Sequence, residues 1–436
     1  MNPPGTDPSP APASSPGAGA SVQDWLDWLE AIHPTEIDLG LDRVLVVLRR
    51  LFPRKPNARI ITVAGTNGKG TTVATLEKLL QAAGRTTGAY TSPHLQDYNE
   101  RVRLNGTDIS DPVLVSAFEK VEEARGKVSL TYFEFGTLAA FVAFADAGVE
   151  DWILEVGLGG RLDAVNVLDA DCAVITSIDI DHIGFLGDNR EVIGFEKAGI
   201  LRPGIFAVCA DPEPPASVLQ QAAAQKVNLQ VTGRDYQLAP ANGDANTVEL
   251  TVAGDHIKLP AGPLPVQSVA AAVVLARKLL PDVAPSSLGD IARTVSVPGR
   301  FELLGSSPFV RADVGHNPHA ARWLSGQVSA SRLTGSKVHA VYAALADKDV
   351  EGVMTAMKSV ADQWYFAGLD VPRGLAVDQL VSHARACGIT DSEGYGSVSQ
   401  ALDAAIANAR PDDCIVVFGS FYTVAEARAK LAGAGS

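Results

Sequence analysis

Short apolar runs alternate along the chain with longer segments in which apolar residues recur every three or four positions. The runs predict buried β-strands, and the three-to-four spacing predicts amphipathic helices. Strands are predicted near residues 59–64, 86–90, 152–157, 172–178, 204–209 and 228–232. Helices are predicted near residues 22–31, 70–83, 112–124, 133–147, 189–200, 216–226 and 267–280. Such alternation indicates a mostly parallel sheet with helices on both faces.

Two segments interrupt this alternation. Residues 236–260 contain strand-like runs around Gly254-Asp255, which predict a small antiparallel hairpin. The segment from Ser296 to Arg300 contains a Pro-Gly pair and predicts a linker. The alternation then resumes, with strands near residues 308–313, 337–343, 363–367 and 414–418. We therefore expect a larger domain at 21–297 and a second, smaller α/β domain at 298–436, which has an ordinary domain size.

Composition narrows the class of protein. A chain of 436 residues is long enough for two or three domains. Residues 1–20 are mostly Pro, Ala, Ser and Gly, so we predict a disordered tail that is no signal peptide. No apolar run reaches about twenty residues, which argues against a membrane span. The cysteines form no Cys-x-x-Cys pair and indicate free thiols in a cytoplasmic protein: Cys172, Cys209, Cys387 and Cys414.

The net charge bears on the partners. A formal charge of −14 argues against nucleic acid, because phosphate backbones require clustered Lys and Arg. If the substrates are anions, the cations that bind them must be local to the site. Individual lysines, arginines and metal ions therefore matter more than the overall balance.

The segment from Gly65 to Thr71 reads Gly-Thr-Asn-Gly-Lys-Gly-Thr and lies between a predicted strand and a predicted helix. A glycine-rich turn at a helix N-terminus presents several backbone N–H groups to one anion. Lys69 supplies a cation for terminal phosphates, and Thr71 a hydroxyl near a magnesium ion. The spacing is not the usual one, because Gly70 separates Lys69 from Thr71. A plain glycine turn with a solvated lysine is the alternative.

Polar residues follow two other predicted strands of the same sheet. Glu155 ends one apolar run and could bind magnesium, or it could simply cap a turn. Asp179, Asp181 and His182 follow another run, where a histidine with carboxylates is a candidate metal site. A structural histidine is the alternative. Lys197 lies near the end of a predicted helix, where periodicity alone favours a solvated lysine.

Three further segments carry candidate chemistry. In the second domain, Asp313 suits a ribose hydroxyl and His316 a phosphate, whereas Asn317 before Pro318 also fits a helix N-cap. The polar loop 91–102 has a length typical of functional loops. Phe133-Glu134 and Asp38 to Gly40 could line an aromatic ligand pocket, but their pattern alone favours a structural role.

Together these segments resemble the bacterial folylpolyglutamate synthase/dihydrofolate synthase family, a branch of the Mur-type amide ligases. The resemblance extends from about Trp25 to about residue 430. Typical Mur ligases have Lys followed directly by Thr or Ser, and the intervening Gly70 matches the folate branch. The matching segments are 65–71, 91–95, 155–166, 196–200, 298–300, 316–318, 347–349 and 419–421.

The resemblance implies a P-loop-type, mostly parallel sheet domain like the central domain of Mur ligases, followed by a smaller Rossmann-like α/β domain. It implies that ATP is bound by Thr66, Asn67, Gly68, Lys69, Gly70, Thr71, Arg300 and Asp313. Two magnesium ions are implied, one held by Ser92 and Glu155, the other by Glu155, His182 and a carbamylated Lys197. Catalysis is implied for Lys69, Glu155, His182, Lys197 and His316.

The resemblance also implies where a pteroate would lie. The matching residues are Ile37, Asp38, Leu39, Thr131, Tyr132, Phe133, Glu134, Asp163 and Ala164. One departure concerns the adenine side. Gln267 fits the family pattern, but a position that is often asparagine is Ala270 here.

The implied activity is ATP-dependent addition of L-glutamate to 7,8-dihydropteroate and to tetrahydrofolates through an acyl phosphate. A monomeric, cytoplasmic enzyme with no nucleic-acid or membrane partner is expected. A monovalent-cation requirement stays open, as do the preferred folate and the chain length. The alternatives are folylpolyglutamate synthase activity alone, a Mur-like ligase of cell-wall precursors, and a regulatory or motor ATPase that ligates nothing.

Overall fold

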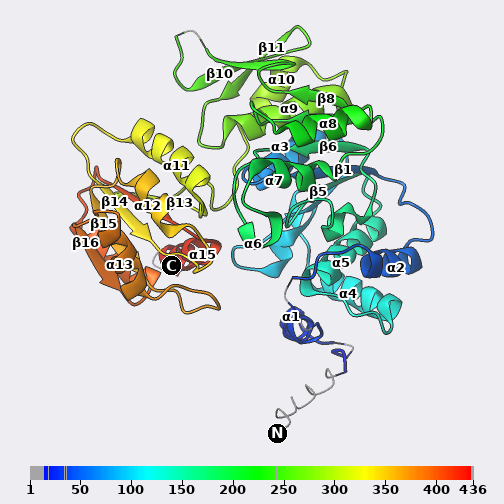
Figure 1. Ribbon diagram of the computed structural model, residues 1–436, viewed down its shortest axis with the longest axis horizontal. Coiled ribbons are helices and arrows are strands. Elements are labelled where there is room, and N and C mark those ends of the chain that lie inside the picture. Colours follow the sequence, from blue (N-terminus) through cyan, green and yellow to red (C-terminus); the bar gives the residue numbers. More distant parts are fainter. Residues whose placement is uncertain (1–13, 18, 34, 36, 242, 434–436) are drawn as a thin grey trace.

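The computed structural model describes residues 14–17, 19–33, 35, 37–241 and 243–433. Two β-sheets with helices on their faces lie next to each other (Figure 1). The predicted α/β class with a mostly parallel sheet and a second sheet domain is confirmed. Of the predicted disordered tail, residues 1–13 and 18 lie outside the described residues, and the rest carries no helix or strand.

The larger sheet has eight strands in the order β4-β3-β2-β5-β1-β6-β7-β8. All neighbours are parallel except the pairs of β3 with β2 and β4. The central strand β1 pairs with β5 and β6, and Val63 lies opposite both Glu155 and Val174. The loops after these three strands therefore meet at one edge. The strands are β1 Arg59–Ala64, β2 Thr87–Tyr90, β3 Val102–Leu104, β4 Thr107–Asp108, β5 Asp151–Glu155, β6 Cys172–Ile175, β7 Phe206–Cys209 and β8 Asn228–Val231.

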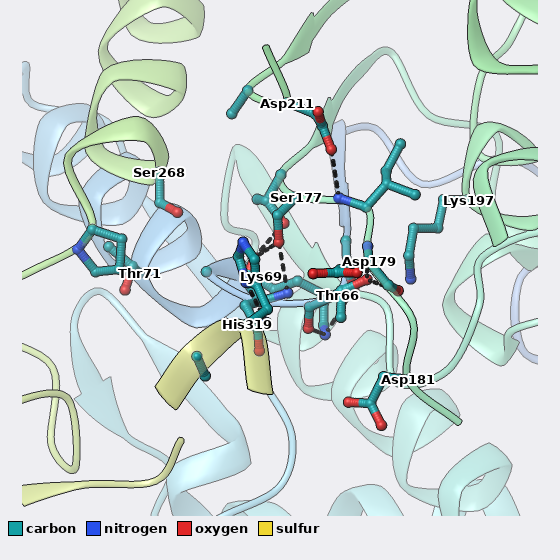
Figure 2. A pocket seen from close by; sticks show the side chains of 18 of the residues that line it. Thr66, Lys69, Thr71, Ser177, Asp179, Asp181, Lys197, Asp211, Ser268 and His319 are labelled. Atoms are coloured by element: carbon teal, nitrogen blue, oxygen red, sulfur yellow. Dashed lines mark hydrogen bonds between the residues drawn. The ribbon is translucent and has the colours of Figure 1, made fainter. Parts of the chain in front are cut away.

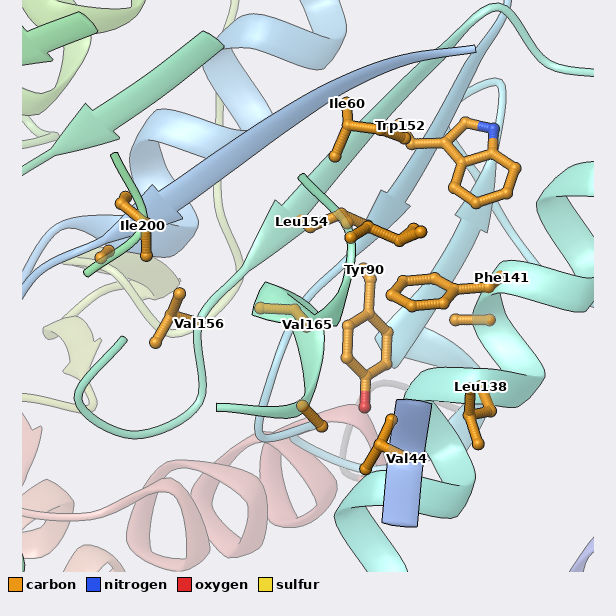
Figure 3. Close-up of a cluster of buried hydrophobic side chains, with 14 of the residues drawn as sticks. Val44, Ile60, Tyr90, Leu138, Phe141, Trp152, Leu154, Val156, Val165 and Ile200 are labelled. Atoms are coloured by element: carbon orange, nitrogen blue, oxygen red, sulfur yellow. The ribbon is translucent and has the colours of Figure 1, made fainter. Parts of the chain in front are cut away.

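Helices cover both faces of this sheet, as the near-continuous apolar character of its strands requires. On one face, residues 134–144 of α5 are all buried. Figure 3 shows the cluster there, in which the rings of Phe141 and Trp152 stack with centroids 5.8 Å apart. The helices are α1 Val22–Ala31, α2 Asp42–Leu51, α3 Lys69–Ala82, α4 Asp111–Arg125, α5 Tyr132–Asp146, α6 Ile183–Leu186, α7 Arg190–Ala198, α8 Ala216–Ala224, α9 Val266–Leu279 and α10 Pro285–Ala292, with 3₁₀ turns at Tyr98–Arg101 and Ala164–Val167.

The short helices α2 and α10 were not expected from the sequence pattern. The N-cap of α2 is Leu41, which makes no side-chain capping bond, so no local start signal marks the helix. The burial of Val44, Val47 and Leu48 stabilises it instead, a contribution that comes from tertiary packing. The predicted strand at 172–178 was wrong for its last three residues, because β6 ends at Ile175.

The predicted antiparallel hairpin is confirmed as part of a three-stranded sheet in the order β11-β10-β9. The chain turns between β10 and β11 at Ala253 and Gly254, which both have positive φ, at 49° and 87°. Two such residues make the turn type that suits a right-handed twisted hairpin. The strands are β9 Tyr236–Pro240, β10 Thr247–Val252 and β11 Asp255–Pro260.

The second large sheet has six strands in the order β12-β13-β17-β14-β15-β16, parallel except for β12. All four strands predicted here are present, and β12 and β16 are additional. The predicted domain boundary between residues 297 and 298 lies just before β12 and stays a prediction. The elements are β12 Glu302–Ser306, β13 Phe309–Asp313, α11 Pro318–Ser331, β14 Val338–Tyr342, α12 Val350–Met357, β15 Gln363–Ala367, α13 Val377–Ala386, β16 Ser392–Tyr395, α14 Val398–Asn408, β17 Cys414–Phe418 and α15 Phe421–Gly433.

Candidate functional site

The glycine-rich segment forms a tight loop between β1 and the N-terminus of α3. Gly68 is the N-cap of α3 with φ 84°, and a Cβ there would lie 2.1 Å from the Ser268 hydroxyl. A Cβ on Gly65 would lie 1.7 Å from the Thr176 hydroxyl, so both positions require glycine. The Lys69 ammonium donates to the carbonyls of Gly65 and Thr66, at 3.1 and 3.3 Å. This places a cation beside the N–H groups at the start of α3.

The loop after β6 holds the glycine-rich loop 65–71, the predicted phosphate loop, in place. The Thr66 N–H donates to the Ser177 carbonyl at 2.7 Å, and the Asn67 N–H to the Ser177 hydroxyl at 3.0 Å. Thr176 donates from its hydroxyl to the Asn67 carbonyl at 2.7 Å. These bonds explain why β6 ends early, because residues 176 and 177 bind the neighbouring loop instead of continuing the strand.

A cavity of about 580 Å³ opens at this edge, between the two large sheets. Figure 2 shows lining side chains such as Lys69, Ser177 and Lys197 gathered around the phosphate loop. Most of the predicted nucleotide, metal and catalytic residues line it together: Thr66, Asn67, Gly68, Lys69, Thr71, Ser92, Glu155, His182, Lys197, Arg300, Asp313 and His316. Gly70 lines a neighbouring cavity of about 540 Å³, which shares Ser92, Glu155 and Arg300 with the first.

Several polar groups of this cavity are buried, and their burial disfavours the charged forms. Burial raises the pKa of Glu155, while the nearby Lys69 and Arg300 oppose that shift. Burial likewise lowers the pKa of Lys69, while Glu155 opposes it. The Thr71 hydroxyl is buried and has no hydrogen-bond partner among the described residues. A buried polar group without a partner is costly, so this arrangement suits a ligand that supplies one.

Lys197 and His182 face the same cavity with altered proton affinities. Burial lowers the pKa of Lys197 to about 7, helped by repulsion from Lys69. Much of its amine is therefore neutral near pH 7, the form that can react with carbon dioxide. Desolvation in the cavity lowers the pKa of His182 to about 4, which keeps its imidazole in the neutral form that binds metals.

The predicted metal ligands suit a magnesium ion whose coordination is completed by phosphate oxygens and water. Within the described ranges, no group of three His, Cys, Asp or Glu side chains could hold a metal alone. Magnesium usually takes only one or two carboxylates and keeps several waters or phosphate oxygens. Glu155 supplies such a carboxylate, and the Ser92 N–H donates to its Oε2 at 3.4 Å. The division of these residues between two ions stays a prediction.

The second sheet supplies the opposite wall. Asp313 is buried at the end of β13, and burial raises its pKa. Its two oxygens accept the N–H groups of Phe301 and Gly315 at 2.9 and 2.7 Å. The Arg300 guanidinium lies over the Phe421 ring, 5.4 Å from its centroid. Both side chains line the cavity, so their predicted contact with a nucleotide is geometrically available.

His316 and Asn317 follow at the start of α11. His316 Nδ1 lies 3.0 Å from the Val314 carbonyl oxygen, which fixes the ring orientation. Asn317 is the N-cap of α11, and its Oδ1 accepts the Ala320 N–H at 2.9 Å. The predicted helix cap is therefore confirmed. Asn317 also contacts the other sheet domain, which the sequence analysis did not foresee.

The predicted pteroate residues lie outside the lining of the cavity. Thr131 and Glu134 form a capping box at the start of α5, with bonds of 2.8 and 3.2 Å. Glu134 also accepts from Arg43 at 2.8 Å, and Arg43 pairs with Asp38. These contacts give Glu134 a structural role. They also join the segment 37–39 to the start of α5, as a shared binding surface requires.

A second set of contacts connects Phe133 and Asp163, two more of the predicted pteroate residues, with the cavity. A Cβ on Gly157 would lie 2.7 Å from the Phe133 ring and 3.3 Å from the Asp163 carboxylate. Gly157 lines the cavity, so Phe133 and Asp163 lie immediately behind its wall. Burial raises the pKa of Asp163 to about 6. Of the other predicted residues, Thr131 and Ala164 are buried, Tyr132 and Leu39 are half-buried, and Ile37 is exposed.

The lining includes residues that sequence reasoning missed or left without a role. Arg190, Asp211 and His319 line the cavity but belong to no motif. On the predicted adenine side, Gln267 and Ser268 line the cavity at the start of α9. Ala270, at the position that is often asparagine in the family, is fully buried in the core between α9 and the sheet. The absence of asparagine there therefore concerns a core position and leaves no gap in the lining of the cavity.

Comparisons with known proteins agree with this arrangement. Two family profiles match the chain, one for the Mur ligase middle domain over residues 63–267 and one for the Mur ligase glutamate ligase domain over residues 299–421. Dihydrofolate synthase/folylpolyglutamate synthase of Escherichia coli (strain K12) is 43% identical over 411 residues, which are 94% of this chain and 96% of that relative.

Solved structures extend the likeness to both sheets. Escherichia coli FolC in complex with DHPP and ADP has 42% sequence identity and a TM-score of 0.90, over 97% of this chain and 100% of that one. Bifunctional folylpolyglutamate synthase/dihydrofolate synthase from Yersinia pestis, complexed with AMPPNP and Mn ion, has 40% identity and a TM-score of 0.88, over 96% and 100%. No helix in the described part of the chain has the length and apolar character needed to cross a membrane.

Proposed function

We propose, since the chain belongs to the dihydrofolate synthase/folylpolyglutamate synthase family, that it joins L-glutamate to a pteroate or folate carboxylate at the expense of ATP. The acid substrates are 7,8-dihydropteroate and tetrahydrofolates, and the route passes through an acyl phosphate. The observation that carries the proposal is the single cavity in which a phosphate loop meets Glu155, His182 and Lys197 from one sheet domain and His316 from the other.

The phosphate loop would bind the ATP phosphates. Its backbone N–H groups lie at the N-terminus of α3, where the helix dipole favours negative charge. Lys69 would reduce the repulsion between the terminal phosphate and the attacking carboxylate, which is the main obstacle to their reaction. Arg300 and Asp313 would contact the nucleotide from the second sheet domain. Gln267 and Ser268 would border the adenine.

Ser92, Glu155, His182 and Lys197 would hold divalent metal, with Lys197 as a carbamate. Bound there, such ions neutralise phosphate oxygens and the approaching carboxylate. Transfer of the terminal phosphoryl group to the carboxylate gives the acyl phosphate. The glutamate amine then attacks the carbonyl carbon, loses a proton, and displaces phosphate from the tetrahedral intermediate. His316 would lie near these oxygens, and the walls of the cavity would exclude water from the acyl phosphate.

The pteroate would approach from the side of Phe133 and Asp163. Both residues contact the position of Gly157 in the cavity wall, which supports this assignment. The ion pairs of Arg43 would hold the segment 37–39 against the start of α5 and shape the far end of the site. Because Asp163-Ala164 resembles the branch that accepts dihydropteroate, we favour an enzyme with both activities.

The proposal includes a division into domains at 21–297 and 298–436, and a monomeric, cytoplasmic protein without nucleic-acid partners. The four cysteines have free thiols, which supports a reducing compartment. Light scattering tests the monomer. A Mur-like ligase of cell-wall precursors remains the second candidate, because both matching profiles carry the Mur ligase description.

One assay separates these functions. The protein receives ATP, labelled L-glutamate and either dihydropteroate or tetrahydrofolate, and the products are compared. We expect label in an amide product with both acids. Label with tetrahydrofolate alone would restrict the protein to folylpolyglutamate synthesis. ATP hydrolysis without label in any product would instead indicate an ATPase.

A further inference from the structure

A group of hydrogen bonds joins the two sheet domains beside the phosphate loop. Its centre is Asp181, in the loop between β6 and α6, whose side chain is only 11% exposed. Asp181 Oδ1 accepts from Lys348 Nζ at 3.1 Å, and Oδ2 accepts from Asn317 Nδ2 at 2.9 Å. Both donors belong to the six-stranded sheet domain. Lys348 precedes α12, and its side chain is 9% exposed.

The same asparagine reaches the phosphate loop. Asn317 and Asn67 exchange two amide hydrogen bonds of 3.1 Å each. Asn67 Nδ2 also lies 2.8 Å from His319 Nδ1, on the first turn of α11. The N-terminus of α11 is therefore bound to the phosphate loop through Asn67 and to the loop after β6 through Asp181.

Asp181 also fixes its neighbour in the cavity. Its Oδ1 accepts the backbone N–H of His182 at 2.8 Å. His182 has φ 53°, in the left-handed region that residues other than glycine rarely adopt. A carboxylate that holds this N–H, and is itself held by Lys348, restrains the backbone that presents the imidazole. Lys348 thus acts on His182 from another domain without lining the cavity.

We propose that Asp181 and Lys348 form an interdomain clamp that positions His182 and Asn67, so that the contact between the two sheet domains and the binding of nucleotide with divalent metal stabilise each other. Lys348 is a positioning residue in this view. The nucleotide and the divalent metal in this proposal rest on the proposed function. The geometry of the clamp does not depend on which acid is the substrate. Because its bonds exist only while the two sheet domains are in contact, any ligand that prefers this arrangement must also stabilise them.

A different ion pair at the same interface provides a matched control. Arg322 on α11 lies 3.3 Å from Asp179 Oδ2, and its side chain is 60% exposed. Such exposed pairs contribute little, because solvent screens them and long side chains lose entropy. Arg322→Met therefore removes a cation from the interface without touching Asp181, His182 or Asn67.

The test measures metal–nucleotide binding rather than activity. Mn²⁺ is titrated into protein with ADP and followed by electron paramagnetic resonance. We expect Lys348→Met to weaken Mn²⁺–ADP binding roughly tenfold, within the usual range of coupling between sites, although Lys348 lies outside the ligand set. Arg322→Met should stay within about twofold of the parent. Small-angle scattering should show a larger radius of gyration for Lys348→Met only.

A double-mutant cycle completes the experiment. If the clamp acts as a unit, Asp181→Asn and Lys348→Met together should weaken binding no more than the stronger single variant. If Lys348→Met does not fold, Asp181→Asn, which is nearly isosteric with the parent residue, takes its place in the test. Lys348→Arg, which keeps the positive charge, then serves as the conservative variant. Parent-like binding in the folded clamp variants, or equal loss in Arg322→Met, would overturn the clamp. If the parent protein binds Mn²⁺–ADP normally but forms no amide product, the proposed function is overturned instead.

Discussion

The two walls of the cavity hold their polar groups in different ways. On the wall of the eight-stranded sheet, Lys197 and Glu155 are buried with shifted pKa values, and the Thr71 hydroxyl lacks a partner in the described structure. On the opposite wall, Asp313 accepts two backbone N–H groups, and Asn317, which follows the lining residue His316, caps α11. The first wall therefore carries groups that only a ligand completes. The second wall carries groups that also maintain the local fold.

This difference predicts how variants should behave. Substitutions of the buried polar side chains on the first wall should reduce ligation while leaving stability unchanged or improved. Substitutions on the second wall should lower stability and ligation together, because the same atoms serve both. The following experiments test this contrast, beginning with the largest expected effect.

Lys69→Ala should abolish ligation and leave a folded protein. The lysine lies in the phosphate loop and donates to the carbonyls of Gly65 and Thr66, two residues that line the cavity. By analogy with the loss of one oxyanion donor, we expect kcat to fall by about 10²–10³. Glutamate incorporation and the thermal unfolding curve are measured on the same sample. Retained incorporation would contradict the assignment of the phosphate loop.

Two glycines of the loop offer a matched pair. Gly68→Ala places a methyl group 2.1 Å from the Ser268 hydroxyl at a φ of 84°, and should cost about 1–3 kcal/mol of stability and weaken nucleotide binding. Gly70→Ala lies in helix α3, where the nearest atom to its methyl group is Glu155 Oε2 at 3.8 Å. It should fold at least as well as the parent, since alanine favours a helix by about 1 kcal/mol. Equal destabilisation of both variants would contradict this reading.

The buried Lys197 predicts a pH dependence of stability. Its pKa is lowered from 10.5 to about 7, so between these values the unfolded chain binds the proton more tightly than the folded protein. Parental stability should therefore rise with pH across this window, relative to Lys197→Met. Below pH 7 the free energy of unfolding of Lys197→Met should exceed that of the parent by a few kcal/mol, which is the order of magnitude that the pKa shift of Lys197 implies. Denaturant unfolding in carbonate-free buffer measures the difference, and a gap that is independent of pH would refute it.

The carbamate is tested separately. If Lys197 is carbamylated, adding bicarbonate should increase ligation by the parent and have no effect on Lys197→Met. Mass analysis of a gently prepared sample should show the added carbon dioxide. An unmodified amine at full activity would exclude the carbamate.

Asn317 separates the two duties of the second wall. Asn317→Ala removes the cap of α11 and should lower stability by about 1 kcal/mol. Asn317→Asp keeps an acceptor for the Ala320 N–H but places an oxygen where Nδ2 now lies, 2.9 Å from Asp181 Oδ2. We expect it to keep more of the parental stability than Asn317→Ala, because the cap is retained, and to bind ADP more weakly than the parent, because two carboxylates would then face each other. Calorimetric titration with ADP measures this, and unchanged affinity would argue against the interdomain contact.

The sequence predicted those parts of the structure that local pattern determines. Apolar runs located the central strands, and the glycine loop, Glu155 and His182 followed from their positions at strand ends. The resemblance then assembled them into one site. The short helices α2 and α10 escaped prediction because packing, rather than a capping signal, stabilises them.

Contacts between distant residues could not be predicted in this way. Asp181 and Lys348 are 167 positions apart, and Arg43 and Glu134 are 91 apart. Nothing in the sequence pattern marks the members of each pair as partners, and only the fold brings them together. For the same reason the pKa of Lys197 was unforeseeable, since it depends on burial rather than on its place near the end of α7.

The fate of the carboxylate oxygen reveals whether an acyl phosphate forms. The protein receives ATP, L-glutamate and dihydropteroate whose carboxylate carries ¹⁸O, and the released phosphate is examined by mass spectrometry. Formation of an acyl phosphate in this cavity predicts that one ¹⁸O atom passes to phosphate for each amide bond formed. Amide product together with unlabelled phosphate would contradict an acyl phosphate. A failure to form any amide from the labelled dihydropteroate would contradict the proposed ligation.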